Sequence, residues 1–231
     1  VNKVKGIFNV YCFVHHWNNP LTDSLKPFRE AHQLGLEAGD LEFSALSAYL
    51  HCNHAYYAGV PLVKLEEDFK AYSDEIKRIK QYTSLNYNLI HWQAAYNLMN
   101  ETPNPVEVNR PAYDEREMYS KHVAANDKTA LFKFHLQKMI LNYLFGNIKM
   151  AYEHGLKGEE YIDAVTGMYV TLAYNFYLGL TLAALVGDQL KQTKRSVRLL
   201  SIIRKFRSWA KHSPVNNQHK LDLLRAEYHR A

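Results

Sequence analysis

The densest group of potential metal ligands in this chain is His51, Cys52 and His54, and His15 and His16 lie earlier in the sequence. His51 and His54 are three residues apart, so on a helix they share one face. A zinc site requires four nitrogen or sulfur ligands in a tetrahedron, and this spacing supplies only part of such a set. We therefore expect histidines that pack between adjacent helices, and we predict neither a metal nor a cofactor.

Two pairs of adjacent acids, Glu66-Glu67 and Glu159-Glu160, have residue types that serve acid–base catalysis. Both pairs lie beside lysines in segments that we predict to be helical, which favours a solvated helix face. The sequence has no Gly-x-x-x-x-Gly-Lys phosphate loop, no Gly-x-Gly-x-x-Gly turn, no kinase His-Arg-Asp or Asp-Phe-Gly triplet and no Gly-x-Ser-x-Gly elbow. We therefore expect that this chain is not an enzyme.

Tyrosine is unusually frequent, with 17 copies, and many of them lie in segments that we expect to be the first helices of helical hairpins. When such hairpins stack into a solenoid, extended concave surfaces form, and aromatic and amide side chains there suit peptide or helix recognition. The alternative is that the tyrosines fill the wide space between helices and keep their hydroxyls at its rim. Counting by helical spacing predicts a concave groove lined by Phe8, Cys12, His15, Tyr49, Asn53, Tyr56, Asn88, His91, Lys133, Tyr174 and Tyr177.

Positive charge is concentrated at the C-terminal end. Residues 188–231 contain 11 Lys and Arg against 3 Asp and Glu, whereas the rest of the chain contains 17 against 20. The predicted basic helix carries Arg195, Arg198, Arg204, Lys205, Arg207 and Lys211, and its expected apolar stripe is Val197, Leu200, Ile203 and Phe206. Like charges at helical spacing repel, and an acidic protein partner would offset that cost. Nucleic acid is less expected, because no exposed aromatic residues alternate with these cations. An ordinary solvated face is the remaining alternative.

Helix-breaking turns recur along the chain at a nearly constant spacing. They fall near residues 18, 59, 101, 146 and 187, so the intervals are 41, 42, 45 and 41 residues. A period of this length indicates stacked helical hairpins, each of which buries its apolar stripe against its neighbours. We predict an all-α, tetratricopeptide-like (TPR-like) α-solenoid that forms one domain over residues 1–231. Its hairpins are predicted at about 1–39, 40–82, 84–125, 127–163 and 165–212, with a C-terminal capping helix at 217–230.

The first helices of these hairpins are predicted at about 2–17, 41–58, 85–99, 128–145 and 166–186. The second helices are predicted at about 21–38, 62–81, 114–124, 148–162 and 189–211. Pro27 lies inside one of these segments. We expect it either in the first turn of a helix that begins near Ser24 or at a kink.

Several residues at the predicted breaks suit helix ends. Asp114 and Glu117 have the spacing of a capping box. Side chains expected to cap the helix that follows them are Asp40, Ser84 and Asp127. Glycines that suit the left-handed position after a helix are Gly39, Gly59, Gly146 and Gly187.

The composition is that of a globular chain, with 47% hydrophobic and 22% charged residues. Two cysteines, Cys12 and Cys52, cannot form a disulfide framework. We therefore expect them to be small buried side chains in a reducing, cytoplasmic compartment. Polar residues and glycines interrupt the longest apolar segment, 165–186, which favours a buried helix over a membrane span. We expect no secretory signal. Because residue 1 is Val rather than Met, we also expect a piece of a longer polypeptide.

Several short segments resemble the helical region found inside large bacterial multi-sensor signal-transduction kinases. The matching segments are 16–21 (HWNNPL), 35–43 (GLEAGDLEF), 125–132 (ANDKTALF), 143–146 (YLFG), 209–210 (WA), 213–214 (SP), 219–220 (HK) and 226–227 (AE). Proteins of that family join a Ser/Thr kinase-like domain, an AAA-type ATPase, a helical arm, a GAF sensor and a histidine kinase. The resemblance implies a helical arm of such a kinase, and it implies no catalytic residue within these segments.

Three functions remain open from the sequence. The first is a non-catalytic interaction or relay module that binds a protein, a peptide or a neighbouring kinase or ATPase domain of the same polypeptide. The second is a stand-alone TPR-type adaptor that binds peptides in the tyrosine-lined groove. The third is a binder of anions or nucleic acid through the basic C-terminal end.

Overall fold

The computed structural model describes residues 2–186 and 194–230, and this part of the chain is helical with no β-strand. The α-helices are α1 (Asn2–Phe13), α2 (Leu25–Ala38), α3 (Leu41–Tyr57), α4 (Leu62–Arg78), α5 (Tyr82–Met99), α6 (Glu115–Ala124), α7 (Lys128–Leu144), α8 (Ile148–Glu159), α9 (Tyr169–Val186), α10 (Lys194–His212) and α11 (Pro214–Arg230). Three short 3-10 helices connect them, namely η1 (His15–Trp17), η2 (Leu21–Ser24) and η3 (Ile162–Val165). The prediction of an all-α chain is confirmed for these residues.

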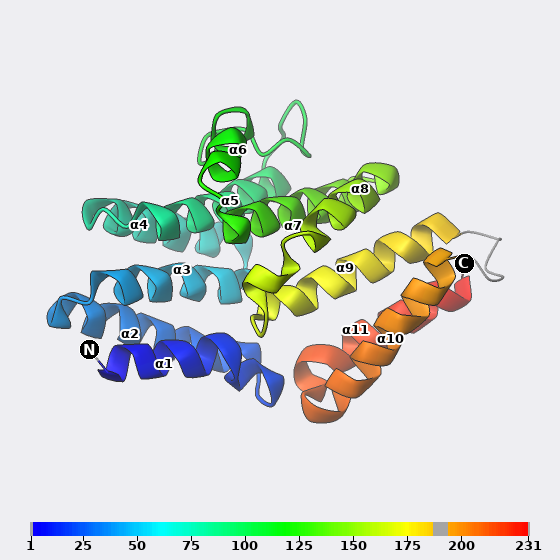
Figure 1. Cartoon of the computed structure of the whole chain (residues 1–231), viewed down its shortest axis with the longest axis horizontal. Coiled ribbons are helices and arrows are strands. Elements are labelled where there is room, and N and C mark those ends of the chain that lie inside the picture. Colours follow the sequence, from blue (N-terminus) through cyan, green and yellow to red (C-terminus); the bar gives the residue numbers. More distant parts are fainter. Residues whose placement is uncertain (1, 187–193, 231) are drawn as a thin grey trace.

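Helices follow one another in space in the order of the sequence. Each odd-numbered helix contacts the next odd-numbered one, from α1 through to α11. Helices α2, α4, α8 and α10 each pack against the two odd-numbered helices that flank them in the chain, and α6 packs on α7. In Figure 1, α3, α5, α7 and α9 lie in the middle of the molecule, while α6 stands apart at the top of the view.

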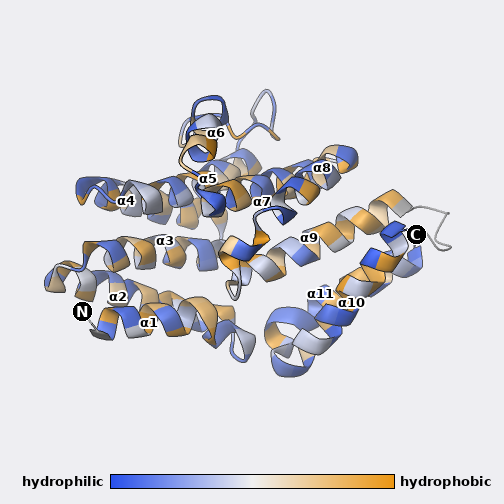
Figure 2. Ribbon diagram, in the orientation of Figure 1, coloured by the Kyte–Doolittle hydropathy of each residue, from blue (hydrophilic) through white to orange (hydrophobic). Residues whose placement is uncertain are grey.

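The inner helices are buried around most of their circumference. Every residue of α7 from Ala130 to Asn142 is buried, and so is every residue of α3 from Ser47 to Ala55. Helix α9 is hydrophobic over much of its length, whereas the lower parts of α10 and α11 are mainly hydrophilic (Figure 2). A helix that is buried on all sides has neighbours on all sides. The core therefore runs through the middle of the stack.

Most of the predicted helix bounds agree with the structure to within about three residues. Pro27 occupies the first turn of α2, which confirms the first of its two predicted placements. Asp127 caps α7 by accepting a hydrogen bond from the Ala130 amide at 3.0 Å, and Asp114 caps α6 by accepting one from the Arg116 amide at 3.1 Å. Gly39, Gly59 and Gly146 have φ values of 71°, 79° and 81°, as predicted for the position after a helix.

Three capping predictions are corrected by the structure. Helix α5 begins at Tyr82, so Ser84 lies inside the helix, buried, instead of capping it. Asp40 precedes α3, but its side chain makes no capping hydrogen bond. The carboxylate of Glu117 pairs with the Lys121 ammonium at 2.6 Å, so only the Asp114 half of the predicted capping box forms. The predicted turn at Gly187-Asp188 and the predicted start of the basic helix at 189 lie outside the described residues.

The two ends of the described chain meet. Figure 1 shows the α1–α2 hairpin beside the α10–α11 hairpin at the bottom of the view. The Asn216 amide donates to the carbonyl oxygens of His16 and Asn19 at 2.8 and 2.7 Å, and its oxygen accepts from the Leu21 amide at 3.0 Å. The Trp17 ring packs near the Trp209 ring, with centroids 5.6 Å apart. Residues almost 200 positions apart thus close the molecule into a compact stack.

Candidate functional site

The expectation of an open tyrosine-lined groove is wrong, because most of the predicted groove residues are buried. Residues with at most 1% exposure are Cys12, Tyr49, Asn53, Asn88, His91 and Lys133, and Phe8 and Tyr174 are also buried. Side chains of α3 reach helices two and three places further along the stack. Tyr49 meets Lys133 of α7, and Tyr57 meets Tyr169 of α9. The inner helices therefore approach so closely that the residues predicted to face a ligand face one another instead.

Lys133 lies at the centre of this interior cluster. Its Nζ is 4.9 Å from the centroid of the Tyr49 ring and 5.3 Å from that of Tyr87, and it has no hydrogen-bond partner among the described residues. Burial lowers the pKa of Lys133 to about 8. Burial also raises the pKa of Cys12 to about 12, and Lys133 opposes that rise. The two aromatic faces compensate only part of the cost of enclosing an ammonium group.

A second polar pair beside this lysine is fully satisfied. His91 Nδ1 lies 2.9 Å from the Tyr87 carbonyl oxygen, so it donates that hydrogen bond and Nε2 accepts one from the Asn53 amide at 2.7 Å. Both ring nitrogens are thus used by the neutral imidazole. Burial lowers the pKa of His91 to about 3. Asn53 and His91 therefore fix α3 against α5 and present nothing to a ligand.

The remaining predicted groove residues are distributed over separate contacts. Phe8 packs edge-on against Phe43, with ring centroids 5.1 Å apart, and the His15 ring lies 4.6 Å from Tyr11. The Asn88 amide donates to the Phe69 carbonyl at 3.1 Å, toward α4. The Tyr174 hydroxyl donates to the Gly155 carbonyl at 2.8 Å, toward α8. These side chains join neighbouring helices and do not form one surface.

Tyr56 and Tyr177 are the exceptions, because both line a cavity of about 220 Å³. We call it the tyrosine pocket. It lies where the C-terminal ends of α3, α5 and α7 approach α9 and α11. Its lining residues are Tyr56, Tyr57, Leu62, Leu98, Leu144, Tyr169, Ala173, Phe176, Tyr177 and Lys220. Two of the eleven residues predicted to line the groove thus line a cavity, which is much smaller than the predicted groove.

Lys220 is the charged residue of the tyrosine pocket. Its Nζ donates to the Asn216 carbonyl oxygen at 2.9 Å and to His219 Nε2 at 2.8 Å, and it lies 5.9 Å from the centroid of the Phe176 ring. Burial lowers the pKa of Lys220 to about 8. The same residue also lines an adjoining cavity of about 200 Å³, together with Tyr57 and Tyr169. Sequence reasoning missed Lys220, because its neighbours come from helices far apart in the chain.

The six predicted cations of the basic helix have three kinds of surroundings. Arg198 pairs with Glu159 at 2.7 Å, and Lys205 donates to the Asn175 amide oxygen at 3.3 Å, so both face the body of the protein. Arg195 lies over the Tyr152 ring at 5.2 Å. The other three are exposed, as Arg195 and Lys205 also are, and within the described residues they make no ion pair, side-chain hydrogen bond or ring contact. These are Arg204, Arg207 and Lys211, which we call the cationic strip.

The apolar stripe of this helix is rotated from its prediction. Ile203 and Phe206 are buried as expected, but Val197 is 62% exposed and Leu200 is half-buried. The observed buried stripe is Ser196, Leu199, Ile202, Ile203, Phe206 and Ala210. Helix α10 contacts both α9 and α11, so its buried surface is wider than a single three-residue row.

The histidines at 51 and 54 serve packing contacts. His51 Nδ1 hydrogen-bonds the Leu25 carbonyl at 2.9 Å, and His54 Nδ1 contacts the Ser24 hydroxyl at 2.7 Å. No group of three or more His, Cys, Asp or Glu side chains in the described part of the chain could hold a metal ion. A closer pair, which sequence reasoning missed, is His135 and His154, whose Nδ1 atoms are 3.0 Å apart. Burial lowers the pKa of these two histidines to about 3 and about 4.

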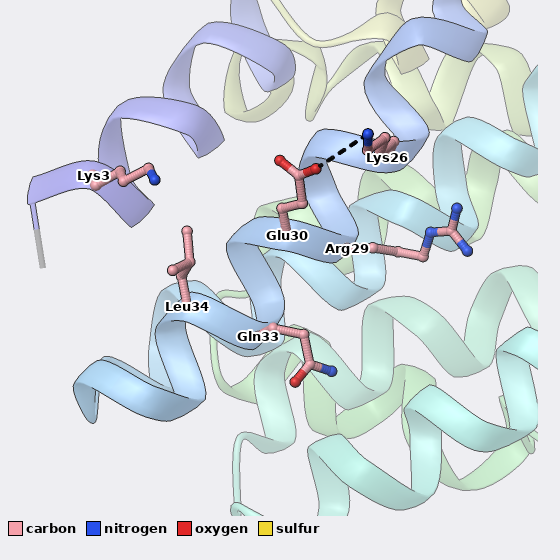
Figure 3. Close-up of a pocket in the computed structure, with 6 residues that line it drawn as sticks. All are labelled: Lys3, Lys26, Arg29, Glu30, Gln33 and Leu34. Atoms are coloured by element: carbon pink, nitrogen blue, oxygen red, sulfur yellow. Dashed lines mark ion pairs between the residues drawn. The ribbon is translucent and has the colours of Figure 1, made fainter.

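Other candidate features have ordinary surroundings. A recess of about 570 Å³ between α1 and α2 is lined by Lys3, Lys26, Arg29, Glu30, Gln33 and Leu34 (Figure 3). All of these except Leu34 are exposed, and Glu30 already pairs with Lys26 at 3.8 Å, so a ligand there would remain in water. Of the paired acids, Glu67, Glu159 and Glu160 are exposed, as expected of a solvated face.

Two further features concern the cysteines and the membrane. Both Cys12 and Cys52 are buried free thiols, which confirms their predicted role in packing. None of the described helices is long and apolar enough to cross a membrane.

Comparison with known proteins gives no relative. No protein-family model matches the chain, and no curated protein or solved structure is significantly similar to it.

Proposed function

We propose that this chain is a non-catalytic interaction module, built as a TPR-like α-solenoid, that binds an acidic segment of a protein partner through the cationic strip of α10. The observation that carries the proposal is a charge imbalance on one helix. Helix α10 contains seven Lys and Arg and no Asp or Glu. Six of the seven are exposed, and Lys194 and the three cations of the cationic strip make no ion pair, side-chain hydrogen bond or ring contact in the described part of the structure.

The spacing of the strip favours a partner that lies along the helix. Arg204, Arg207 and Lys211 follow one another at steps of three and four residues, so they share one side of α10. Val197, seven residues before Arg204, continues this side and is 62% exposed. A segment that carries acids and an apolar side chain would complement both features. Charge complementarity of this kind mainly increases association rate and specificity.

The stacking of the helices supports the solenoid part of the proposal. Successive odd-numbered helices contact one another, and most even-numbered helices bridge two of them, as neighbouring units do in repeat proteins. Contacts of α3 with α7 and α9, and of the chain ends with each other, make this stack more closed than an open solenoid. The resemblance to the helical arm of multi-sensor kinases suggests a neighbouring domain of the same polypeptide as the natural source of the acidic segment. The module would then relay a signal if it bound that domain differently in two of its states.

The test reverses the strip and compares it with matched cations elsewhere. We would change Arg204, Arg207 and Lys211 to Glu and, as the control, the exposed Lys64, Lys70 and Lys77 of α4 to Glu. Fluorescence anisotropy with a labelled Glu-rich amphipathic peptide would be measured at low and moderate salt, with duplex DNA in parallel. We expect the strip reversal to weaken peptide binding at least about tenfold, the control to change it little, and salt to weaken it steeply.

Two outcomes would contradict the proposal. Equal losses in the strip variant and the α4 control would mean that the peptide senses only net charge. A strip-dependent affinity for DNA that exceeds the affinity for the peptide would favour nucleic acid as the partner. Circular dichroism of each variant would show that the helices remain folded.

A further inference from the structure

We propose that the tyrosine pocket binds a small aromatic monocarboxylate, with the ring between the tyrosine side chains and the carboxylate on Lys220. This inference concerns a site about which the proposed function says nothing, and it stands or falls independently of the cationic strip. It rests on the lining of the pocket, the donors of Lys220 and the location of the pocket in the stack.

The lining of the pocket favours a ligand with an aromatic or otherwise planar apolar ring. Five of its ten lining residues are aromatic, and four of the others are aliphatic. Tyr56, Tyr57, Phe176 and Tyr177 are partly exposed, so their side chains border space that is open to a ligand. Aromatic walls favour a flat ring through offset-stacked and edge-to-face contacts. A cavity of about 220 Å³ has room for one such ring with a short substituent.

The hydroxyls of the two adjacent tyrosines are already used. Tyr56 donates to the Gln137 side-chain oxygen at 3.3 Å, and Tyr57 accepts from the Gln137 amide at 3.0 Å. Gln137 is itself buried, so it fixes both rings from behind. The rings are therefore held in place to act as walls. Beside the hydroxyls of Tyr169 and Tyr177, the polar lining group is Lys220, and it is the charged one.

Lys220 favours a ligand that carries a negatively charged group. An ammonium group has three N–H donors, and two of them are used by the Asn216 carbonyl and His219 Nε2. The third donor is free within the described residues. No Asp or Glu lines this pocket or the adjoining cavity, so Lys220 lacks a counter-ion there. A ligand carboxylate would supply both the missing acceptor and the missing charge. A charged hydrogen bond of this kind is stronger than a neutral one.

The location of the pocket joins distant parts of the chain. Tyr56 and Tyr57 belong to α3, Phe176 and Tyr177 to α9, and Lys220 to α11. A ligand that touches all three helices links the N-terminal part of the stack to its C-terminal part. Because it would bind the closed arrangement in preference to any looser one, it would stabilise the closed stack. The pocket is thus suited to couple a small metabolite to the rigidity of the module.

The test uses 3-phenylpropionate as the probe and its neutral isostere, 3-phenylpropionamide, as the paired ligand. Binding to the full 231-residue chain would be followed by ligand-observed NMR or calorimetry. We expect the acid to bind at least about tenfold more tightly than the amide. Lys220→Met removes the charge and retains the stem, so it should abolish this preference. Lys149→Met, at an exposed lysine of α8 that belongs to neither the pocket nor the cationic strip, should leave the preference intact.

A second variant tests the place of binding without disturbing the core. Leu144 lies at the rim of the pocket and is 49% exposed, so Leu144→Trp adds bulk there with little effect on folding. We expect it to weaken the acid and the amide alike. The proposal is overturned if the wild-type chain binds neither probe, if acid and amide bind equally, or if both Lys220→Met and Leu144→Trp bind the acid as the wild type does.

Discussion

At the residue scale, the most unusual feature is a lysine that is enclosed without a hydrogen-bond acceptor. Lys133 is fully buried, and its ammonium meets only aromatic faces. Contacts of this kind favour the charge by about 1–2 kcal/mol when desolvated, whereas burying an uncompensated polar group costs about 1–3 kcal/mol or more. The balance predicts that the lysine lowers the stability of the fold at neutral pH.

We therefore expect Lys133→Met to stabilise the protein by about 1–3 kcal/mol at pH 7, because the apolar side chain has a similar length and needs no acceptor. Folding lowers the pKa of Lys133 from its usual 10.5 to about 8. Between these values the unfolded chain binds more protons than the folded one, so wild-type stability gains from this residue as pH rises. The advantage of Lys133→Met should shrink between pH 8 and pH 10.5. Urea unfolding of both proteins across this range measures the difference between their free energies of unfolding. Titration of the tyrosines occurs in both proteins and therefore cancels from that difference. An advantage that stays constant with pH would contradict the buried charge.

At the element scale, helix packing depends on close approaches as well as on apolar stripes. A Cβ added to Gly35 of α2 would lie 2.7 Å from the Ser44 Cβ and 2.9 Å from its Cα, on α3. Ser44 also donates to the His32 carbonyl at 2.9 Å, and His32 Nε2 lies 2.8 Å from the Glu75 carboxylate of α4. Helices α2, α3 and α4 are therefore locked together at this contact.

We expect Gly35→Ala to destabilise the protein by about 1–3 kcal/mol, because backbone atoms of α3 would have to move. Gly6→Ala in α1 is the matched control. A Cβ at that position meets nothing within 4 Å, so the higher helix propensity of Ala should stabilise the protein by up to about 1 kcal/mol. Thermal unfolding of the two variants should shift in opposite directions. Two shifts of the same sign would mean that α2 and α3 are not held at this distance.

The sequence predicts these elements well because their signals are local. Gly39 and Gly146 mark helix ends through a backbone conformation that favours glycine, and Asp127 caps a helix through a group three residues away. The predicted break before α5 lies too late in the sequence, because Lys80, not a glycine, takes the left-handed conformation there, with φ of 58°. Local signals therefore fix where helices begin and end.

The candidate site could be predicted only in part, because exposure depends on contacts between distant segments. Tyr49 and Lys133 are 84 positions apart in sequence, and no spacing rule shows that they meet. Helical periodicity indicates which residues of α3 share a face with Tyr49, but it does not reveal how closely the inner helices approach, so a side chain predicted to line a groove lies in the core. One available signal was the apolar circumference of α7, which already required neighbours on every side.

At the scale of the whole molecule, closure depends on a few contacts between the chain ends. Asn216 is buried and joins α11 to the turn between α1 and α2, where it satisfies two carbonyl groups and one amide. The tyrosine pocket lies next to this junction, since Lys220 donates to the Asn216 carbonyl. A change at residue 216 should therefore loosen the junction between the ends before it unfolds the inner helices.

We expect Asn216→Asp to destabilise the closed stack by on the order of 3 kcal/mol. The substituted carboxylate can still accept from the Leu21 amide, but it faces the carbonyl oxygens of His16 and Asn19, which lose their donor. Asn9→Asp is the control, because it makes the same chemical change at an exposed position of α1. Hydrogen exchange localises the effect. Amides of residues 14–24 and 212–222 should lose protection in Asn216→Asp while those of α7 keep it, because local opening at the junction exposes only its own hydrogen bonds. Uniform loss of protection across the chain would instead mean that closure and the inner stack unfold as one unit. In that case a ligand in the tyrosine pocket would stabilise the whole stack and not only the junction between its ends.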